Sequence, residues 1–164
     1  MVVPKFRAWD KMHNEWSNGF FIYSEGGLYT PNYGFNRKHL KKRTDVYPIA
    51  KQERFILMHS TGLFDVNGKE IFEGDVVKFN DIWSEYGYEG YVDGTSEGEN
   101  FSEIIKTEDG FSFGRTKIPE SSVFYFLNDE HMKFSEIVKS DDFSMVVIGN
   151  IYENPELVEE ASND

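Results

Sequence analysis

One stretch near the middle of the chain, residues 58–78 (MHSTGLFDVNGKEIFEGDVVK), constrains the fold more than any other. Asn67-Gly68 predicts a β-hairpin with a type I′ turn, because both central residues of that turn need a positive φ. Glu73-Gly74-Asp75 then interrupts the apolar pattern, and residues 76–79 resume it with β-branched side chains that suit a strand. A ligand-binding loop at Gly74-Asp75 is an alternative, but turn chemistry favours a plain corner.

Short apolar segments separated by turn residues recur along most of the chain. We expect strands at residues 3–9, 16–23, 54–58, 101–105, 111–114, 123–127 and 142–150, with a turn at residues 59–62. Residues 132–138 favour a short helical turn, although a strand is also allowed, and Asn154-Pro155 has the chemistry of a helix start. Strands at a spacing of about ten residues, with turns between them, favour an all-β barrel or sandwich.

The composition restricts the available chemistry. The chain has no cysteine, which removes disulfides, thiolate metal sites and cysteine nucleophiles. No apolar run reaches the roughly 18 residues of a membrane span, and the first residues lack the apolar centre of a secretory signal. These features favour a cytoplasmic protein without membrane contact.

Charge is unevenly distributed along the chain. Residues 1–56 carry ten Lys/Arg and five Asp/Glu, a net charge of +5, and residues 57–164 carry −17, which gives −12 overall. The basic cluster Arg37, Lys38, Lys41, Lys42 and Arg43 is a candidate for nucleic-acid binding. Because the chain as a whole repels phosphates, a connector, or docking on an acidic surface of this chain or of another copy, is favoured over nucleic acid.

Residues 80–98 are acidic, aromatic and rich in glycine. Trp83, Tyr86, Tyr88 and Tyr91 lie there among carboxylates, and such rings offer a large contact area at a small cost in side-chain entropy. These four residues are therefore candidates for binding a protein partner. Alternatively, they alternate in a twisted hairpin and cover one end of a barrel. The sequence allows either an ordered hairpin or a mobile loop here.

The sequence lacks recognisable catalytic and metal-binding patterns. His13, His39, His59 and His131 occur in four separate segments without paired spacing, so no metal site is predicted. Phosphate-binding glycine loops and nucleophile elbows are absent, and Ser60 would point away from its neighbour His59 on a strand. No cofactor is predicted. The 29 acidic residues still permit an acid–base site assembled by folding, so an enzyme stays an alternative.

Three segments carry a family resemblance. They are residues 6–10 (FRAWD), residues 61–77 with TGL, NGKEI and EGDVV, and residues 147–157 (VIGNIYENPEL). Together they resemble the YopX family of small proteins encoded by bacterial phages and prophages. The resemblance implies a β-rich fold with an SH3-like barrel in its carboxy-terminal part, in the cytoplasm of a bacterial host, and it implies no catalytic residue. Residues 59–60 and 64–66 depart from the usual family pattern.

We therefore expect a mainly β protein in three parts. Residues 1–54 form a hairpin region with the basic connector, residues 55–155 an SH3-like barrel, and residues 156–164 an acidic tail next to a short helical turn. The expected function is a non-catalytic interaction module, whose partner is a host or phage protein or a second copy of the chain. Nucleic-acid binding through residues 37–43 and an uncharacterised enzyme are the alternatives.

Overall fold

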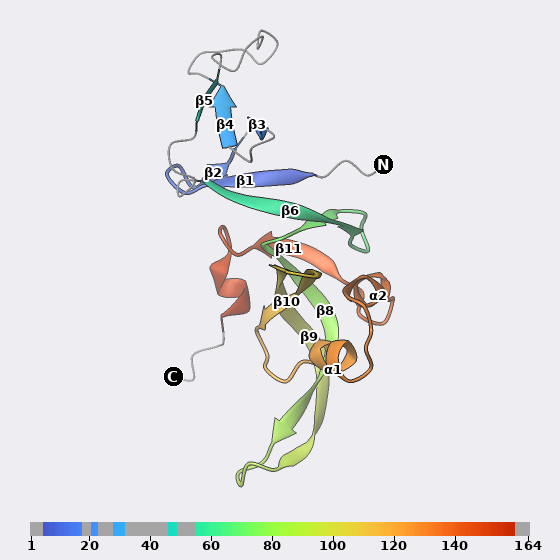
Figure 1. Cartoon of the computed structure of the whole chain (residues 1–164). Helices are drawn as coiled ribbons and strands as arrows, with labels where there is room; N and C mark the ends of the chain where they lie inside the picture. The colour runs from blue at the N-terminus through green and yellow to red at the C-terminus, as the bar shows by residue number, and fades with distance from the viewer. Residues whose placement is uncertain (1–4, 18–20, 23–27, 32–45, 49–54, 160–164) are drawn as a thin grey trace. The chain divides into compact units, whose positions relative to one another are not determined.

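The computed structural model of the chain describes residues 5–17, 21–22, 28–31, 46–48 and 55–159. The chain divides into two compact units, Met1–Met58 and His59–Asp164. Strands predominate over helices, so the protein is mainly β, as predicted (Figure 1). None of the helices formed by the described residues has the length and apolar character to cross a bilayer.

The first unit opens with an antiparallel hairpin of β1 (Phe6–Asp10) and β2 (Glu15–Trp16), in which Trp9 lies opposite Trp16. The two indole rings meet edge to face with their centroids 5.0 Å apart. The guanidinium carbon of Arg7 lies 4.3 Å from the centroid of the Trp16 ring, a cation–π contact. The aromatic residues of FRAWD thus fasten the hairpin across its two strands.

The predicted strand at residues 16–23 is divided between two partners. Trp16 pairs with β1, whereas β3 (Phe21–Ile22) pairs with β4 (Leu28–Pro31). β4 also pairs with β5 (Val46–Pro48), which completes a three-stranded antiparallel sheet in the order β3-β4-β5.

β6 (Phe55–Phe64) begins in the first unit, where it lies beside β1, and ends in the second, where it pairs with β7 (Glu70–Phe72). The predicted turn at residues 59–62 is wrong, because the strand continues through them. Gly62 has a φ of 73°, and the register with β7 shifts between Ser60 and Phe64. The turn-forming residues therefore produce an irregularity within the strand instead of a chain reversal.

The hairpin at Asn67-Gly68 forms, but its turn is not the predicted type I′. Only Gly68 has a positive φ, of 80°; its amide donates to the Asp65 carbonyl at 3.0 Å, and the Asp65 amide donates to the Lys69 carbonyl at 2.8 Å. The buried Asp65 carboxylate sets this three-residue loop, because Oδ1 accepts the amides of Asn67 and Lys69 at 2.9 and 2.8 Å. Its Oδ2 accepts the amide of Val147 at 2.9 Å.

A plain backbone corner leads into the main sheet, as the turn chemistry predicted. Gly74 has a φ of 85°, and Oδ2 of the buried Asp75 accepts the amide of Phe72 at 2.8 Å. The main sheet is antiparallel in the order β10-β9-β8-β11. Its strands are β8 (Asp75–Tyr86), β9 (Val92–Thr107), β10 (Gly110–Thr116) and β11 (Val146–Asn150).

Two strand predictions in this sheet have different outcomes. The hairpin of residues 101–105 with residues 111–114 is confirmed, since β9 pairs with β10 across a turn in which Thr107 lies opposite Gly110. The last predicted strand, residues 142–150, begins only at Val146.

The predicted strand at residues 123–127 is wrong, because Ser122–Asn128 is the helix α1. Its N-cap, Ser121, accepts the amide of Val123 on its side chain at 3.4 Å. A short, wholly apolar run does not distinguish a buried strand from a buried helix. The polar residues that start the helix decide between the two.

The two helical predictions are confirmed. α2 (Phe134–Lys139) occupies most of the segment expected to be a helical turn. η4 (Pro155–Val158) is a 3₁₀ turn that begins at the predicted proline, although the Asn154 side chain makes no capping hydrogen bond.

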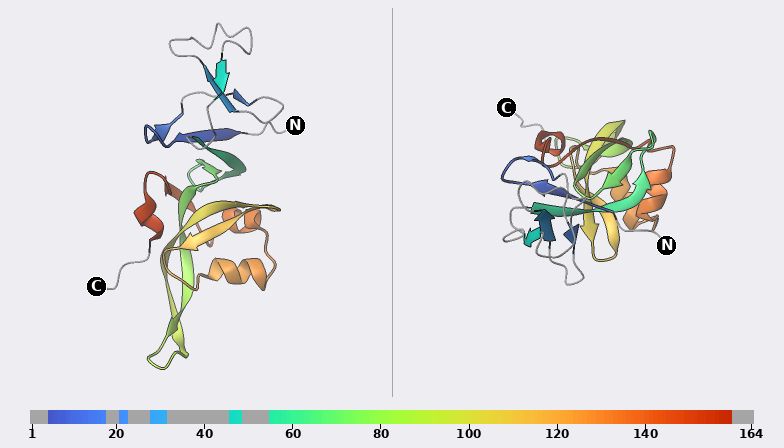
Figure 2. Two further views of the ribbon diagram at one scale, coloured as in Figure 1. Left: turned by 60° about the vertical axis from the view of Figure 1, so that its left-hand side comes forward. Right: turned by 90° about the horizontal axis from the view of Figure 1, so that it is seen from above.

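The core of the second unit lies where the two α-helices pack on one face of the main sheet (Figure 2). Val77, Phe79 and Ile104 from the sheet and Val123 and Ile137 from the helices are at most 1% exposed. This face of the sheet is therefore filled by side chains.

Candidate interaction surface

β8 and β9 continue beyond their neighbours as a two-stranded ribbon, residues 80–100, which we call the arm (Figures 1 and 2). β11 pairs with β8 only as far as Lys78, and β10 pairs with β9 only from Ser102. At the tip, the Gly87 amide donates to the Tyr91 carbonyl at 2.8 Å. The segment that the sequence left open is therefore an ordered hairpin.

Three of the four aromatic candidates lie exposed near the tip of the arm. The exposed fractions of Tyr86, Tyr88 and Tyr91 are 54%, 108% and 75%, and Val92 beside them is 60% exposed. These tyrosines do not cover one end of the sheet, which was the alternative interpretation. A group of exposed apolar side chains at the end of a ribbon is available for contact with another molecule.

Trp83 is placed differently from the three tyrosines. It is half-buried, and a Cβ built at Gly98 on the neighbouring strand would lie 3.1 Å from Cη2 of the indole ring. The ring therefore lies over the backbone at Gly98, where a larger residue would crowd it. Trp83 also lines a cavity of about 590 Å³, together with Tyr125. The structure thus assigns Trp83 to the base of the arm and the tyrosines to its tip.

Tyr125 and Glu130 form a hydrogen-bonded pair beside this cavity. The Tyr125 hydroxyl donates to Oε1 of Glu130 at 2.7 Å. This hydrogen bond, followed by the negative charge of the same carboxylate, raises the pKa of the Tyr125 phenol above its usual 10.0. The pair adds negative charge next to the base of the arm.

The arm is strongly acidic. Residues 80–100 contain no lysine or arginine. They contain six carboxylates, those of Asp81, Glu85, Glu89, Asp93, Glu97 and Glu99. Glu99 forms an ion pair at 3.1 Å with Lys78, which precedes the arm. The sequence pattern identified the aromatic residues as candidates, but only the pairing of the two strands shows that these carboxylates share one ribbon with them.

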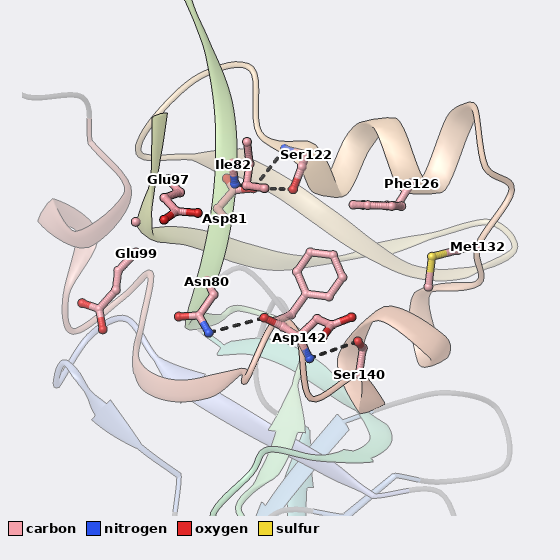
Figure 3. Close-up of a pocket in the computed structure, with 12 residues that line it drawn as sticks. Asn80, Asp81, Ile82, Glu97, Glu99, Ser122, Phe126, Met132, Ser140 and Asp142 are labelled. Carbon is pink, nitrogen blue, oxygen red and sulfur yellow. Dashed lines mark hydrogen bonds between the residues drawn. The ribbon is translucent and has the colours of Figure 1, made fainter. Parts of the chain in front are cut away.

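A cavity of about 690 Å³ lies at the base of the arm, bounded by β8 and β9, by α1 and by the segment before β11 (Figure 3). Among the residues that the structure describes, its lining contains four carboxylates and four large apolar side chains, and no lysine, arginine or histidine. The twelve lining residues are Asn80, Asp81, Ile82, Glu97, Gly98, Glu99, Ser122, Phe126, Met132, Ser140, Asp142 and Phe143.

A buried polar network connects the arm to the start of α1. Asp81 Oδ1 accepts the amide and the hydroxyl of Ser122, at 3.0 and 2.6 Å, and Oδ2 accepts Nδ2 of Asn100 at 2.8 Å. Asn100 is fully buried and also exchanges two hydrogen bonds with the backbone of Ile118, each of 2.9 Å. The network positions α1 against the arm. Sequence reasoning missed it, because Asp81 and Ser122 lie 41 residues apart.

The hydroxyl of Ser122 donates a hydrogen bond to Asp81, and no histidine is among the described residues that line the cavity. The network therefore lacks the histidine base of a serine–histidine pair.

In the first unit, Asp10, His13 and Glu15 form a group whose potential metal ligands lie within 4.8 Å of one another. Nδ1 of His13 contacts Oδ2 of Asp10 at 2.8 Å, and Oδ1 of Asp10 accepts the amide of Met12 at 2.9 Å. These contacts stabilise the turn between β1 and β2. The spacing of the histidines in the sequence gave no indication of this group.

The nucleic-acid candidates Arg37, Lys38, Lys41, Lys42 and Arg43 lie outside the residues that the structure describes. Their role stays a prediction from sequence.

Comparison with known proteins identifies the family. The sequence model of a family described as YopX protein matches residues 5–159. The crystal structure of EF1440 from Enterococcus faecalis is 23% identical over 97% of this chain and 100% of that chain, with a TM-score of 0.48. YopX from Bacillus subtilis is 19% identical over 96% and 97%, with a TM-score of 0.43. A search of curated proteins finds no match. The family model matches nearly the whole length of this chain, and the chain therefore belongs to the YopX family.

Proposed function

We propose that this YopX-family chain is a non-catalytic protein-interaction module that binds a basic surface of a host or phage protein through the arm. The observation that carries the proposal is the exposure of Tyr86, Tyr88 and Tyr91 at the tip of an acidic ribbon. The resemblance noted above further supports a phage or prophage origin and action in the cytoplasm of the bacterial host.

Contact area and charge each contribute to this binding. Tyrosine side chains are enriched at interface hot spots, because they bury much apolar surface while their hydroxyl groups stay solvated or hydrogen-bonded. The six carboxylates of the arm favour a partner of positive charge and accelerate its association. They also disfavour the pairing of two arms, because like charges would face each other. The partner is therefore a basic protein and not the arm of a second copy.

Affinity capture from host cells tests the proposal. The intact chain is compared with a variant in which Tyr86, Tyr88 and Tyr91 are replaced by serine, and captured proteins are quantified by mass spectrometry. The matched control carries serine at Met12, Phe64 and Val66, which are also more than half exposed but lie outside the arm. We expect one or more basic proteins to be retained by the intact chain and the control and lost from the tyrosine variant. Equal retention by all three proteins, or no reproducible partner, would contradict the proposal.

Nucleic-acid binding is the second candidate, supported by the net charge of +5 in residues 1–56. The prediction is a gel shift at low salt that disappears when Arg37, Lys38, Lys41, Lys42 and Arg43 are replaced by glutamine. Phosphate contacts are strongest at low ionic strength, so the absence of a shift at about 50 mM salt rejects this function.

We also propose that residues 55–155 close into an SH3-like barrel. The antiparallel order β10-β9-β8-β11 and the β6–β7 hairpin beside it support this architecture. Small barrels leave loops and strand ribbons free to bind partners, in accordance with the role proposed for the arm.

A further inference from the structure

We infer that the cavity at the base of the arm binds an arginine side chain of the partner protein. The inference rests on the proposed function only in taking the partner to be a protein. The choice of arginine comes from the charges, the apolar walls and the volume of the cavity.

The wall of the cavity carries a buried negative charge. Asp81 is 4% exposed, and the four groups that donate to its carboxylate, the amides of Ile82 and Ser122, the Ser122 hydroxyl and the Asn100 amide, are all neutral. These donors solvate the carboxylate without cancelling its charge. A buried negative charge beside a cavity favours a cation there, because the low local dielectric strengthens the attraction.

Further carboxylates lie at the rim of the cavity. Glu99 is held by Lys78, but within the described part of the chain no cation lies within ion-pairing distance of Glu97 or Asp142. Asn80 donates from Nδ2 to the carbonyl of Asp142 at 3.4 Å, which ties the segment before β11 to the arm. Figure 3 shows Glu97 and Glu99 on the β9 side of the cavity, with Phe126 and Met132 on the helix side. A guest therefore meets both carboxylates and apolar groups within the cavity.

Part of the cavity wall is apolar. Ile82, Phe126, Met132 and Phe143 line the cavity, and the rings of Phe126 and Phe143 meet edge to face with their centroids 5.6 Å apart. A small inorganic cation gains nothing from such walls. An arginine side chain satisfies both features, because its aliphatic stem packs on apolar groups while its planar guanidinium pairs with carboxylates and stacks on rings. Lysine fits less well, since its ammonium is compact and strongly hydrated.

The cavity volume of about 690 Å³ is compatible with this guest, since it leaves room for the arginine stem, its flanking backbone and solvent. The cavity lies at the base of the ribbon whose tip carries the three exposed tyrosines. A partner held by the tyrosines at the tip can therefore extend toward the base and place its arginine there.

The test is an NMR titration of the full chain with N-acetyl-arginine methylamide. The isosteric but uncharged citrulline derivative and the lysine derivative are titrated in parallel. We expect the arginine compound to shift the amide signals of Ile82, Phe126 and Asp142. The lysine compound should bind more weakly, and the citrulline compound should leave these signals in place. Equal binding of arginine and citrulline, equal binding of arginine and lysine, or shifts located elsewhere would overturn the inference.

Two substitutions and a matched control complete the test. Asp142→Asn and Glu97→Gln each remove one rim charge and should weaken arginine binding about fivefold to tenfold, as expected for a charge in direct contact with the guest. Glu89→Gln removes the same charge at the tip of the arm and should change the affinity less than about twofold, since the charge is distant and screened. If both rim variants keep their dispersed amide spectra and the wild-type affinity, the assignment is wrong.

The small probe separates this inference from the proposed function. Capture of a basic partner through the tyrosines without binding of the arginine compound would overturn the cavity assignment alone. Binding of the arginine compound without a partner that depends on the tyrosines would overturn the proposed function alone.

Discussion

At the scale of single residues, Asp65 illustrates how one carboxylate determines a local structure. It accepts three amides, two within its own turn and one from Val147 on β11. Asp65→Ala should lower the free energy of unfolding by about 2–4 kcal/mol, because the buried amide of Val147 and two partly buried turn amides lose a charged acceptor. Chemical denaturation measures this change. Glu108→Ala, at the exposed turn between β9 and β10, is the control and should change stability by less than about 0.5 kcal/mol. A loss of similar size in both variants would refute this role of Asp65.

The same residue shows the limit of reading a turn from sequence. The Asn67-Gly68 pair predicts a hairpin, and the hairpin exists. Its type is set by the Asp65 carboxylate, which is held in place by an amide 82 residues away. A contact at that separation leaves no mark in the local pattern, so the sequence predicts the chain reversal but not its geometry.

Tyr125 provides a prediction of pH dependence. Glu130 accepts a hydrogen bond from the Tyr125 hydroxyl, and this raises the pKa of the phenol in the folded state. The hydrogen bond therefore stabilises the fold below the unfolded-state pKa, and this contribution is lost as the pH rises through the folded-state pKa. Glu130→Gln should move the Tyr125 pKa down toward its usual value. NMR titration of the tyrosine rings measures the shift, and an unchanged or higher pKa in the variant would contradict the assignment.

At the scale of elements, α1 and the arm depend on each other through Asn100. This side chain donates to Asp81 and to the Ile118 carbonyl and accepts two amides. Asn100→Ala should cost about 2–4 kcal/mol of unfolding free energy, because several buried groups lose their partners together. Hydrogen exchange should accelerate at the start of α1 and at the base of the arm. Faster exchange at the tip alone would show that the network does not position the helix.

The elements differ in how far the sequence predicts them. The hairpin of residues 101–105 with β10 and the helix α2 follow from local patterns: alternation, a glycine turn and helical spacing. Residues 123–127 do not, because five apolar residues in succession fit a buried strand or a buried helix equally well. The helix is selected by its Ser121 cap and by the bonds from Ser122 to Asp81. The sequence indicated the tyrosines of the arm as candidates, but it predicted neither that the arm is an ordered hairpin nor how long it is.

At the scale of the whole molecule, the composition predicts a mainly β chain, and the family resemblance is confirmed over residues 5–159. The boundary between the two compact units, after Met58, lies within β6. The net charge changes from +5 in residues 1–56 to −17 in residues 57–164, close to that point. The charge alone does not define the units, because contacts define them while the strand continues through the boundary. The cavity was likewise not predictable, since its walls come from segments that only folding brings together.

The affinity of the captured basic partner tests most directly whether the arm is a binding surface. Isothermal titration calorimetry at moderate ionic strength compares the intact chain, the triple serine variant at Tyr86, Tyr88 and Tyr91, and the control at Met12, Phe64 and Val66. The account predicts a dissociation constant raised about a hundredfold or more for the tyrosine variant, as expected when several hot-spot side chains are lost, and changed less than about threefold for the control. A tyrosine variant that binds as tightly as the control would contradict it.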